Sequence, residues 1–197
     1  MDDLLARARA GDPAVFGLLL ERYRAYLTLL ARVEIGRHLR SKLDASDLVQ
    51  ETFLEAHRHF DRFAGVELAQ LTFWLRQILM RTLAMQIRRY LGTQARDVRL
   101  ERQLADSLDR SSAGLEAGLA ASISSPSEHA SRSEQSVLLA QAIERLPEDY
   151  RDVIVLRHVE GLTFPEVATR MQRSLDSVEK LWLRGLARLR QLLGEPT

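Results

Sequence analysis

LTFPEVATRMQRSLDSVEKLWLRGLARLR (162–190) is the stretch that decides the fold, because it predicts two helices joined by a tight turn. Thr163 and Glu166 have the spacing of a capping box, which begins the first helix. Residues 172–174 form the turn, and Ser174 is the expected N-cap of the second helix. A short capped helix, a three-residue turn and a long helix together predict a helix-turn-helix.

The second helix of this stretch carries two different faces. Apolar residues recur at three- and four-residue steps from Val178 to Leu193 and predict a buried stripe. Hydroxyl and cationic side chains line another edge: Ser177, Lys180, Arg184 and Arg188. A recognition helix in a major groove needs such side chains for base edges and phosphates. The edge alone leaves open an amphipathic helix with a solvated basic side.

Composition limits the class of protein. The 197 residues suffice for one large or two small domains, and 46% of them are hydrophobic. Cysteine is absent, and no HExxH, GxSxG or Gly-rich phosphate-loop motif occurs. His57 and His59 lie two positions apart, so they do not face each other on a helix. We therefore expect no enzyme, no cofactor and no metal site.

Charge and hydropathy lead us to expect a cytoplasmic protein without membrane insertion. The first residues, MDDLL, are acidic where a secretion signal is basic, and no apolar run approaches membrane-spanning length. The net charge of +1 is unevenly spread. Lys and Arg number 16 against 12 Asp and Glu in 1–100, 3 against 6 in 101–136, and 9 against 9 in 137–197. The neutral last segment is therefore not expected to hold DNA tightly alone.

The helical patterns predict an all-α fold of two small domains joined by a flexible linker. The first domain, 1–100, contains helices over 14–33, 45–63 and 71–91, and Asp12 and Asp44 are the start signals of the first two. Residues 101–136 are rich in Ser, Ala and Gly and show no sustained periodicity, so they are interpreted as a linker with at most transient helix. The second domain, 137–197, contains helices over 137–146 and 148–159 and then the helix-turn-helix.

The first domain offers two candidate binding surfaces. In 45–63, polar and acidic residues lie off the apolar face, and they form either a solvated side or a surface for a protein partner. In 71–91, Phe73 shares a face with several Arg residues, and from Arg76 to Arg99 six Arg oppose only Asp97. Aromatic rings beside guanidiniums suit single-stranded nucleic acid. The alternative is that Phe73 and Trp74 belong to the core.

Three motifs together resemble the bacterial RNA polymerase sigma factors of the extracytoplasmic function (ECF) group. They are DASDLVQETFLEAHRHFDRF (44–63), FWLRQILMRTLAMQIRR (73–89) and LPEDYRDVIVLRHVEGLTFPEVATRMQRSLDSVEKLWLRGLARLR (146–190). They occur in the order of that family and cover most of the chain outside the linker. The resemblance implies a sigma factor that binds core RNA polymerase and directs promoter recognition, duplex opening and transcription initiation at a subset of promoters.

The resemblance also assigns residues. The region 2-like domain would bind core polymerase through Asp47, Gln50, Glu51 and Leu54. It would bind the minus-ten element through Phe73, Trp74, Arg76, Gln77, Arg81, Arg88 and Arg89. The region 4-like domain would bind the minus-thirty-five element through Arg173, Ser174, Ser177, Lys180 and Arg184. Core RNA polymerase and promoter DNA are the implied partners, and inhibition by an anti-sigma factor stays open.

Departures from the family pattern affect the promoter sequence more than the fold. Gln172 stands where the turn usually has Gly, Glu179 replaces a cation, and Leu181 replaces a frequent Arg. Two other classes of function are weighed against the sigma factor. A free-standing helix-turn-helix regulator would bring a dimerisation element for paired half-sites, and none is seen. A helical adaptor would bind only protein.

Overall fold

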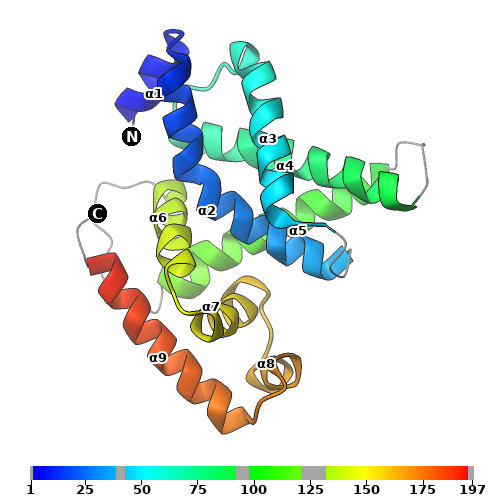
Figure 1. The fold of residues 1–197 in the computed structure, drawn as a ribbon, viewed down its shortest axis with the longest axis vertical. Helices are drawn as coiled ribbons and strands as arrows, with labels where there is room; N and C mark the ends of the chain where they lie inside the picture. Colours follow the sequence, from blue (N-terminus) through cyan, green and yellow to red (C-terminus); the bar gives the residue numbers. More distant parts are fainter. Residues whose placement is uncertain (1, 39–42, 92–97, 121–131, 195–197) are drawn as a thin grey trace. The chain divides into compact units, whose positions relative to one another are not determined.

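The computed structural model describes residues 2–38, 43–91, 98–120 and 132–194. Helices are the only regular secondary structure in these ranges, which confirms the all-α prediction (Figure 1). Contacts divide the chain into two compact units, Met1–Asp109 and Arg110–Thr197. We call them unit 1 and unit 2.

Unit 1 is built around three helices in mutual contact. The elements of unit 1 are α1 (Asp2–Arg9), α2 (Pro13–His38), α3 (Ala45–His59), the 3-10 helix η1 (Phe60–Arg62), α4 (Leu68–Leu91) and the first half of α5 (Val98–Ala120). α3 packs against α2 and α4, and α1 packs against α2. Tyr23 and Tyr26 of α2 are fully buried, as are Leu75 and Leu79 of α4. This core fixes α3 and α4 against each other.

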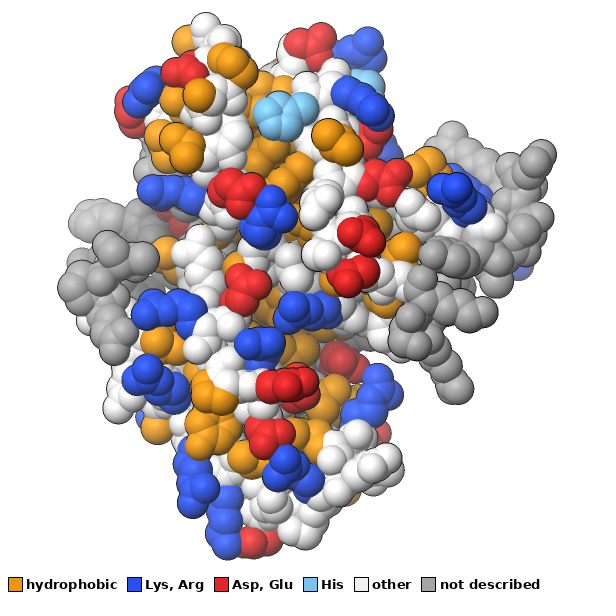
Figure 2. Space-filling view, in the orientation of Figure 1, with side chains coloured by type: hydrophobic (Ala, Val, Ile, Leu, Met, Phe, Trp, Pro, Cys, Tyr) orange, Lys and Arg blue, Asp and Glu red, His pale blue; other side chains and the backbone are white. Residues whose placement is uncertain are grey.

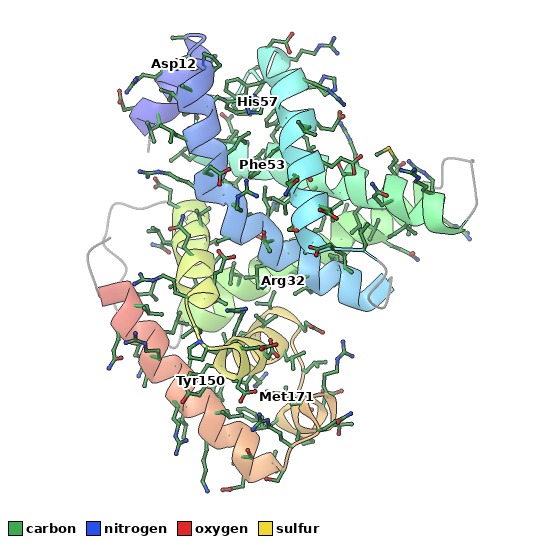
Figure 3. The ribbon with its side chains drawn as sticks, viewed as in Figure 1. Asp12, Arg32, Phe53, His57, Tyr150 and Met171 are labelled. Carbon is green, nitrogen blue, oxygen red and sulfur yellow. The ribbon has the colours of Figure 1, made fainter. Side chains whose placement is uncertain are left out.

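Two of the three predicted helix starts in unit 1, those of the helices over 14–33 and 45–63, are confirmed by their caps. The Asp12 carboxylate accepts hydrogen bonds from the backbone N–H groups of Ala14 and Val15, at 3.1 and 3.2 Å. The Asp44 carboxylate accepts one from the Ser46 N–H at 2.7 Å, and this bond lowers the pKa of Asp44. In each case the side chain satisfies backbone donors that the helix leaves without a partner. Figure 3 shows Asp12 at the start of α2.

α4 begins three residues earlier than the sequence predicts, at Leu68 instead of Leu71. The Gln70 side-chain oxygen accepts hydrogen bonds from the N–H groups of Val66 and Glu67, at 2.7 and 3.1 Å. Gln70 therefore caps the helix from inside its first turn, as the Glu or Gln of a capping box does. Residues 63–67, directly before this start, include no Ser, Thr, Asp or Asn, which is why the sequence pattern missed it.

Residues 101–120 form regular helix, whereas the sequence pattern predicts only a linker with transient helix there. They belong to α5, a helix of 23 residues. Leu104 and Leu108, one four-residue step apart, are buried, and so is Leu115. Ser107, Ser111 and Ser112 are buried as well. Because small polar residues occupy much of the buried side, the apolar periodicity is weak in the sequence. Residues 121–131 of the predicted linker lie outside the described residues.

Unit 2 contains the predicted helix-turn-helix. After the second half of α5 come α6 (Arg132–Glu144), α7 (Glu148–Ile154), the π-helix η2 (Val155–Val159), α8 (Phe164–Met171) and α9 (Leu175–Gly194). α9 packs against α6, α7 and α8. Gly185 allows a close approach of α9 to α7, because a Cβ there would lie 3.1 Å from Ile154 Cδ1 and 3.4 Å from Tyr150 Cβ. Figure 3 labels Tyr150 on the α7 side of this contact.

Both helices of the helix-turn-helix, α8 and α9, begin at the predicted caps. The Thr163 N–H and hydroxyl both donate to the Glu166 carboxylate at 2.7 Å, which completes the capping box and lowers the pKa of Glu166. Gln172 ends α8 in the left-handed region, with φ 54° and ψ 43°. Ser174 then begins α9, because its hydroxyl accepts from the Ser177 N–H at 3.3 Å.

Candidate nucleic-acid and partner interfaces

One face of α3 presents polar residues together with an exposed leucine. Asp47, Gln50 and Leu54 are spaced by three and four residues and are exposed, while Val49 and Phe53 on the other side are buried. Leu54 leaves 58% of its surface accessible. Asp and Glu side chains lie over this side of α3 in Figure 2. Leu54 and its polar neighbours are therefore accessible to a protein partner.

Glu51 differs from these neighbours because it is tied to α4. It is half-buried, and its carboxylate accepts a hydrogen bond from the Gln86 side-chain nitrogen at 2.6 Å. On its other side, α3 contacts α2: the Arg24 guanidinium of α2 lies 4.9 Å from the ring centre of Phe53 of α3. Figure 3 shows Phe53 between α2 and α3. α3 is thus held to α4 through Glu51 and to α2 through Phe53, and its outer face is left exposed.

Along α4, side chains at four-residue steps form an accessible line. Phe73 is 52% exposed, Gln77 is half-buried, and Arg81 and Arg89 are exposed. Met85, which sequence reasoning did not single out, occupies the intervening step and is 44% exposed. We call Phe73, Gln77, Arg81, Met85 and Arg89 the α4 line. It combines ring, thioether and guanidinium groups that can stack on bases and pair with phosphates.

Trp74 lies in an aromatic cluster instead of on the α4 line. Its ring centre is 5.0 Å from that of Phe63 and 6.1 Å from that of Phe60, and Phe60 stacks on Phe16 at 3.7 Å. The Phe63 ring covers Gly65, where a Cβ would come within 2.3 Å of Phe63 Cζ. The cluster therefore fixes the segment that leads into α4. The sequence signal for it was the closely spaced Phe60 and Phe63.

Arg76 and Arg88 differ from Arg81 and Arg89 because α5 pairs with them. The Arg88 guanidinium donates to the Glu101 carboxylate at 2.9 Å, and the two side chains are only 22% and 18% exposed. Arg76 lies 3.3 Å from the Asp109 carboxylate and is 17% exposed. The same guanidinium is 5.9 Å from the Phe73 ring centre. Sequence reasoning missed both acidic partners because it left 101–136 without structure.

In unit 2, the residues assigned to the minus-thirty-five element lie on the turn and on α9, and we call them the strip: Arg173, Ser174, Ser177, Lys180 and Arg184. The Arg173 guanidinium donates to both carboxylate oxygens of Asp149, at 2.9 and 2.8 Å, and Lys180 pairs with Asp176 at 2.7 Å. Ser177 is half-buried, and Ser174 and Arg184 are exposed. Arg184 makes no ion pair with any of the residues that the structure describes. The strip is therefore at the surface, with two of its cations held by neighbouring carboxylates.

A histidine of η2 and a tryptophan of α9 are in direct contact. The Trp182 indole N–H donates to His158 Nε2 at 2.9 Å, so this histidine nitrogen carries no proton. Burial lowers the pKa of His158, and the nearby charge of Arg157 lowers it further. The Phe164 ring meets Trp182 edge-on at 5.3 Å between ring centres. These contacts join η2, α8 and α9.

In the described part of the chain, no helix is both long and apolar enough to cross a membrane. Within the same residues, no group of three or more His, Asp or Glu side chains gathers where a metal ion could bind.

Comparisons with known proteins match both units. The family model described as Sigma-70 region 2 matches residues 22–91, and the model described as Sigma-70, region 4 matches residues 136–189. The ECF RNA polymerase sigma-E factor of Haemophilus influenzae is 30% identical over 175 residues, which is 89% of this chain and 85% of that protein. The protein of the same name from Escherichia coli K12 is 33% identical over 177 residues, covering 89% and 84%.

Solved structures are also similar over most of the chain. CnrH, solved in complex with the cytosolic domain of CnrY, is 26% identical with a TM-score of 0.37, covering 98% of this chain and 96% of that chain. The RsbN-BldN complex gives 22% identity, a TM-score of 0.35 and coverage of 95% and 98%. At these TM-scores the superpositions add nothing to the fold described above.

Proposed function

The chain belongs to the ECF group of RNA polymerase sigma factors, and from that premise we propose how its surfaces share promoter recognition. The outer face of α3 binds core RNA polymerase through Asp47, Gln50, Glu51 and Leu54. The α4 line, with the adjacent Trp74, Arg76 and Arg88, holds the opened strand of the minus-ten element. The strip of Arg173, Ser174, Ser177, Lys180 and Arg184 reads the minus-thirty-five element. The observation that supports this proposal is that each surface exposes a side chain able to bind its partner. These are the apolar Leu54 on α3 and the cationic Arg81 on α4 and Arg184 on α9.

Neither DNA surface is sufficient alone. A good base contact contributes about 1–3 kcal/mol, and residues 137–197 have no net charge to add non-specific affinity, with 9 Lys and Arg against 9 Asp and Glu. When a polymerase carries both surfaces, the second binding event becomes intramolecular and takes place at a high effective concentration. Flipping a base out of the duplex costs a few kcal/mol, and stacking on a ring such as Phe73 recovers part of it.

The partners follow from this role. They are core RNA polymerase and promoter DNA, and the resemblance adds an anti-sigma factor as a third proposed partner. The chain is proposed to work in the cytoplasm, where the polymerase is, and to perform no catalysis itself. A free-standing regulator is the second candidate, and it would bind promoter DNA tightly without core polymerase.

The α3 surface is tested by core binding. We expect Gln50→Ala with Leu54→Ser to weaken binding to core polymerase at least tenfold, because an apolar anchor and its polar neighbour are lost together. Glu51 is left intact, since its bond to Gln86 supports the fold. The measurement is a fluorescence titration of the full chain with core enzyme.

Leu18→Ser is a matched control, because Leu18 on α2 is 61% exposed and Leu54 is 58% exposed. It should leave core affinity unchanged. If Leu18→Ser weakens core binding as much as the double variant does, or if the double variant has no effect, α3 is not part of the polymerase interface.

A further inference from the structure

The first half of α5 lies against the nucleic-acid side of α4. Glu101 pairs with Arg88, and eight residues later Asp109 pairs with Arg76. The earlier residue of α5 meets the later residue of α4, so the two helices run in opposite directions. Two acidic groups of one helix thus meet two of the cations that the sigma-factor resemblance assigns to the minus-ten element.

α5 is anchored where it makes these pairs. Leu104 and Leu108, which lie between Glu101 and Asp109 in sequence, are buried. Between them the Ser107 hydroxyl donates to the Glu34 carboxylate of α2 at 3.0 Å. Both carboxylates are therefore carried by a packed helix; Glu101 is mostly covered, with 18% of its side chain exposed, and Asp109 stays open to solvent, with 56% exposed.

A guanidinium binds a carboxylate and a phosphate through the same fork of N–H donors. Arg88 cannot give its best donor geometry to a phosphate while Glu101 accepts from it. Asp109 places a negative charge 3.3 Å from the Arg76 guanidinium, where a phosphate would otherwise bind. A strand that approaches α4 must displace these carboxylates or bind beside their negative charge. Either way, the carboxylates lower the affinity for the strand.

We propose that Glu101 and Asp109 compete with single-stranded DNA for Arg88 and Arg76, so that α5 limits how tightly the α4 line binds a strand. The inference rests on the proposed function of α4 and adds a regulatory element to it. Arg81 and Arg89 make the first contact with phosphate. Arg76 and Arg88 bind phosphate only after their ion pairs with Asp109 and Glu101 are broken.

The test uses the full chain and a fluorescein-labelled oligo(dT) probe, with anisotropy as the readout. Asp109→Asn should tighten binding about two- to fivefold, and Glu101→Gln with Asp109→Asn roughly tenfold, as expected when ion pairs of this strength are removed. The dependence of log K on log salt should also steepen by about 0.7 for each guanidinium that newly neutralises a phosphate. A purely structural role of the two acids would not move this slope.

Three controls keep the result interpretable. Asp106 is exposed on the same helix, and none of the described residues pairs with it, so Asp106→Asn makes the same charge change without touching α4. It should shift the affinity by less than half as much as Asp109→Asn. Asp109→Glu keeps the charge and should keep wild-type affinity. Circular dichroism confirms that each variant is folded, and Asp109, with 56% of its side chain exposed, is the variant least expected to unfold the unit.

Unchanged or weaker binding by folded Asp109→Asn, or an equal gain with Asp106→Asn, would overturn the inference. Transcription with core polymerase separates this failure from failure of the proposed function. If the wild-type chain directs promoter-dependent starts while oligo(dT) binding ignores the acids, only the role of α5 is wrong. If the chain directs no such starts, the assignment of α4 to promoter DNA fails with it.

Discussion

Gln172 holds the turn of the helix-turn-helix in a conformation that its side chain disfavours. Its φ of 54° and ψ of 43° lie in the left-handed region, where a Cβ is crowded by the following carbonyl oxygen. Glycine has no such penalty, which is why it is common at helix C-termini. The orientation of α9 relative to α8 therefore carries a small conformational cost at one residue.

We predict that Gln172→Gly stabilises unit 2 by about 0.5–1 kcal/mol, because the left-handed conformation becomes unstrained. Urea denaturation followed by circular dichroism measures the change. Arg170→Gly is the matched control, since Arg170 is helical and exposed in α8. It should destabilise by a similar amount. If both substitutions destabilise equally, the turn conformation is not strained as described.

His158 makes unit 2 sensitive to mild acid. Its pKa is lowered in the folded protein, first by burial and then by Arg157. At pH values between this lowered pKa and the usual histidine pKa of about 6.5, His158 is protonated in the unfolded chain but not in the folded chain. Stability is therefore fully present above about pH 6.5 and falls as the pH drops below it.

We expect His158→Gln to flatten this loss, because glutamine can still accept the Trp182 N–H bond but does not titrate in this range. Urea unfolding curves at several pH values between about 5 and 7 give the comparison. Trp182 fluorescence, in a Trp74→Phe background, reports unit 2. Equal acid sensitivity of the variant and the parent would assign the effect to other groups.

At the scale of elements, α5 shows how a glycine permits close packing. A Cβ at Gly114 would lie 2.7 Å from the His158 carbonyl oxygen, a backbone atom that cannot move without shifting η2. At Gly17, in the interior of α2, a Cβ would meet nothing within 4 Å. Both glycines are helical, so the same substitution probes a close contact at one site and only helix propensity at the other.

We predict opposite signs for these two substitutions. Gly17→Ala should stabilise the chain by about 0.5–1 kcal/mol through helix propensity. Gly114→Ala should destabilise by roughly 1–3 kcal/mol, because overpacking against backbone forces η2 and α5 apart. Thermal unfolding followed by circular dichroism distinguishes them. A stabilising Gly114→Ala would mean that α5 does not press on η2.

The sequence predicted best those elements whose local chemistry and buried face agree. Thr163 and Glu166 signalled the start of α8, and Asp44 that of α3, because each cap is made by residues next to it. α5 was missed because serines share its buried side with leucines, and their burial depends on partners distant in sequence such as Glu34. The pairing of Arg76 and Arg88 with acidic residues could not be predicted either, because both acidic residues lie on α5.

For the whole molecule, family membership and surface chemistry point to one division of work. We propose that α3 of unit 1 binds core polymerase, that the α4 line holds the opened strand, and that the strip of unit 2 reads duplex DNA. The strip is tested with the full chain bound to core polymerase. We expect Arg184→Ala to weaken upstream-element binding by about 1 kcal/mol through loss of one charged DNA contact, and to leave core binding unchanged. Loss of core binding as well would indicate misfolding.

The most direct test is transcription from a library of genomic DNA fragments by core polymerase with this chain added, followed by sequencing of transcript 5′ ends. We predict start sites that are absent with core enzyme alone and that share sequence elements near minus ten and minus thirty-five. Start sites identical to those of core enzyme alone, with a chain that is folded and bound to it, would contradict the account.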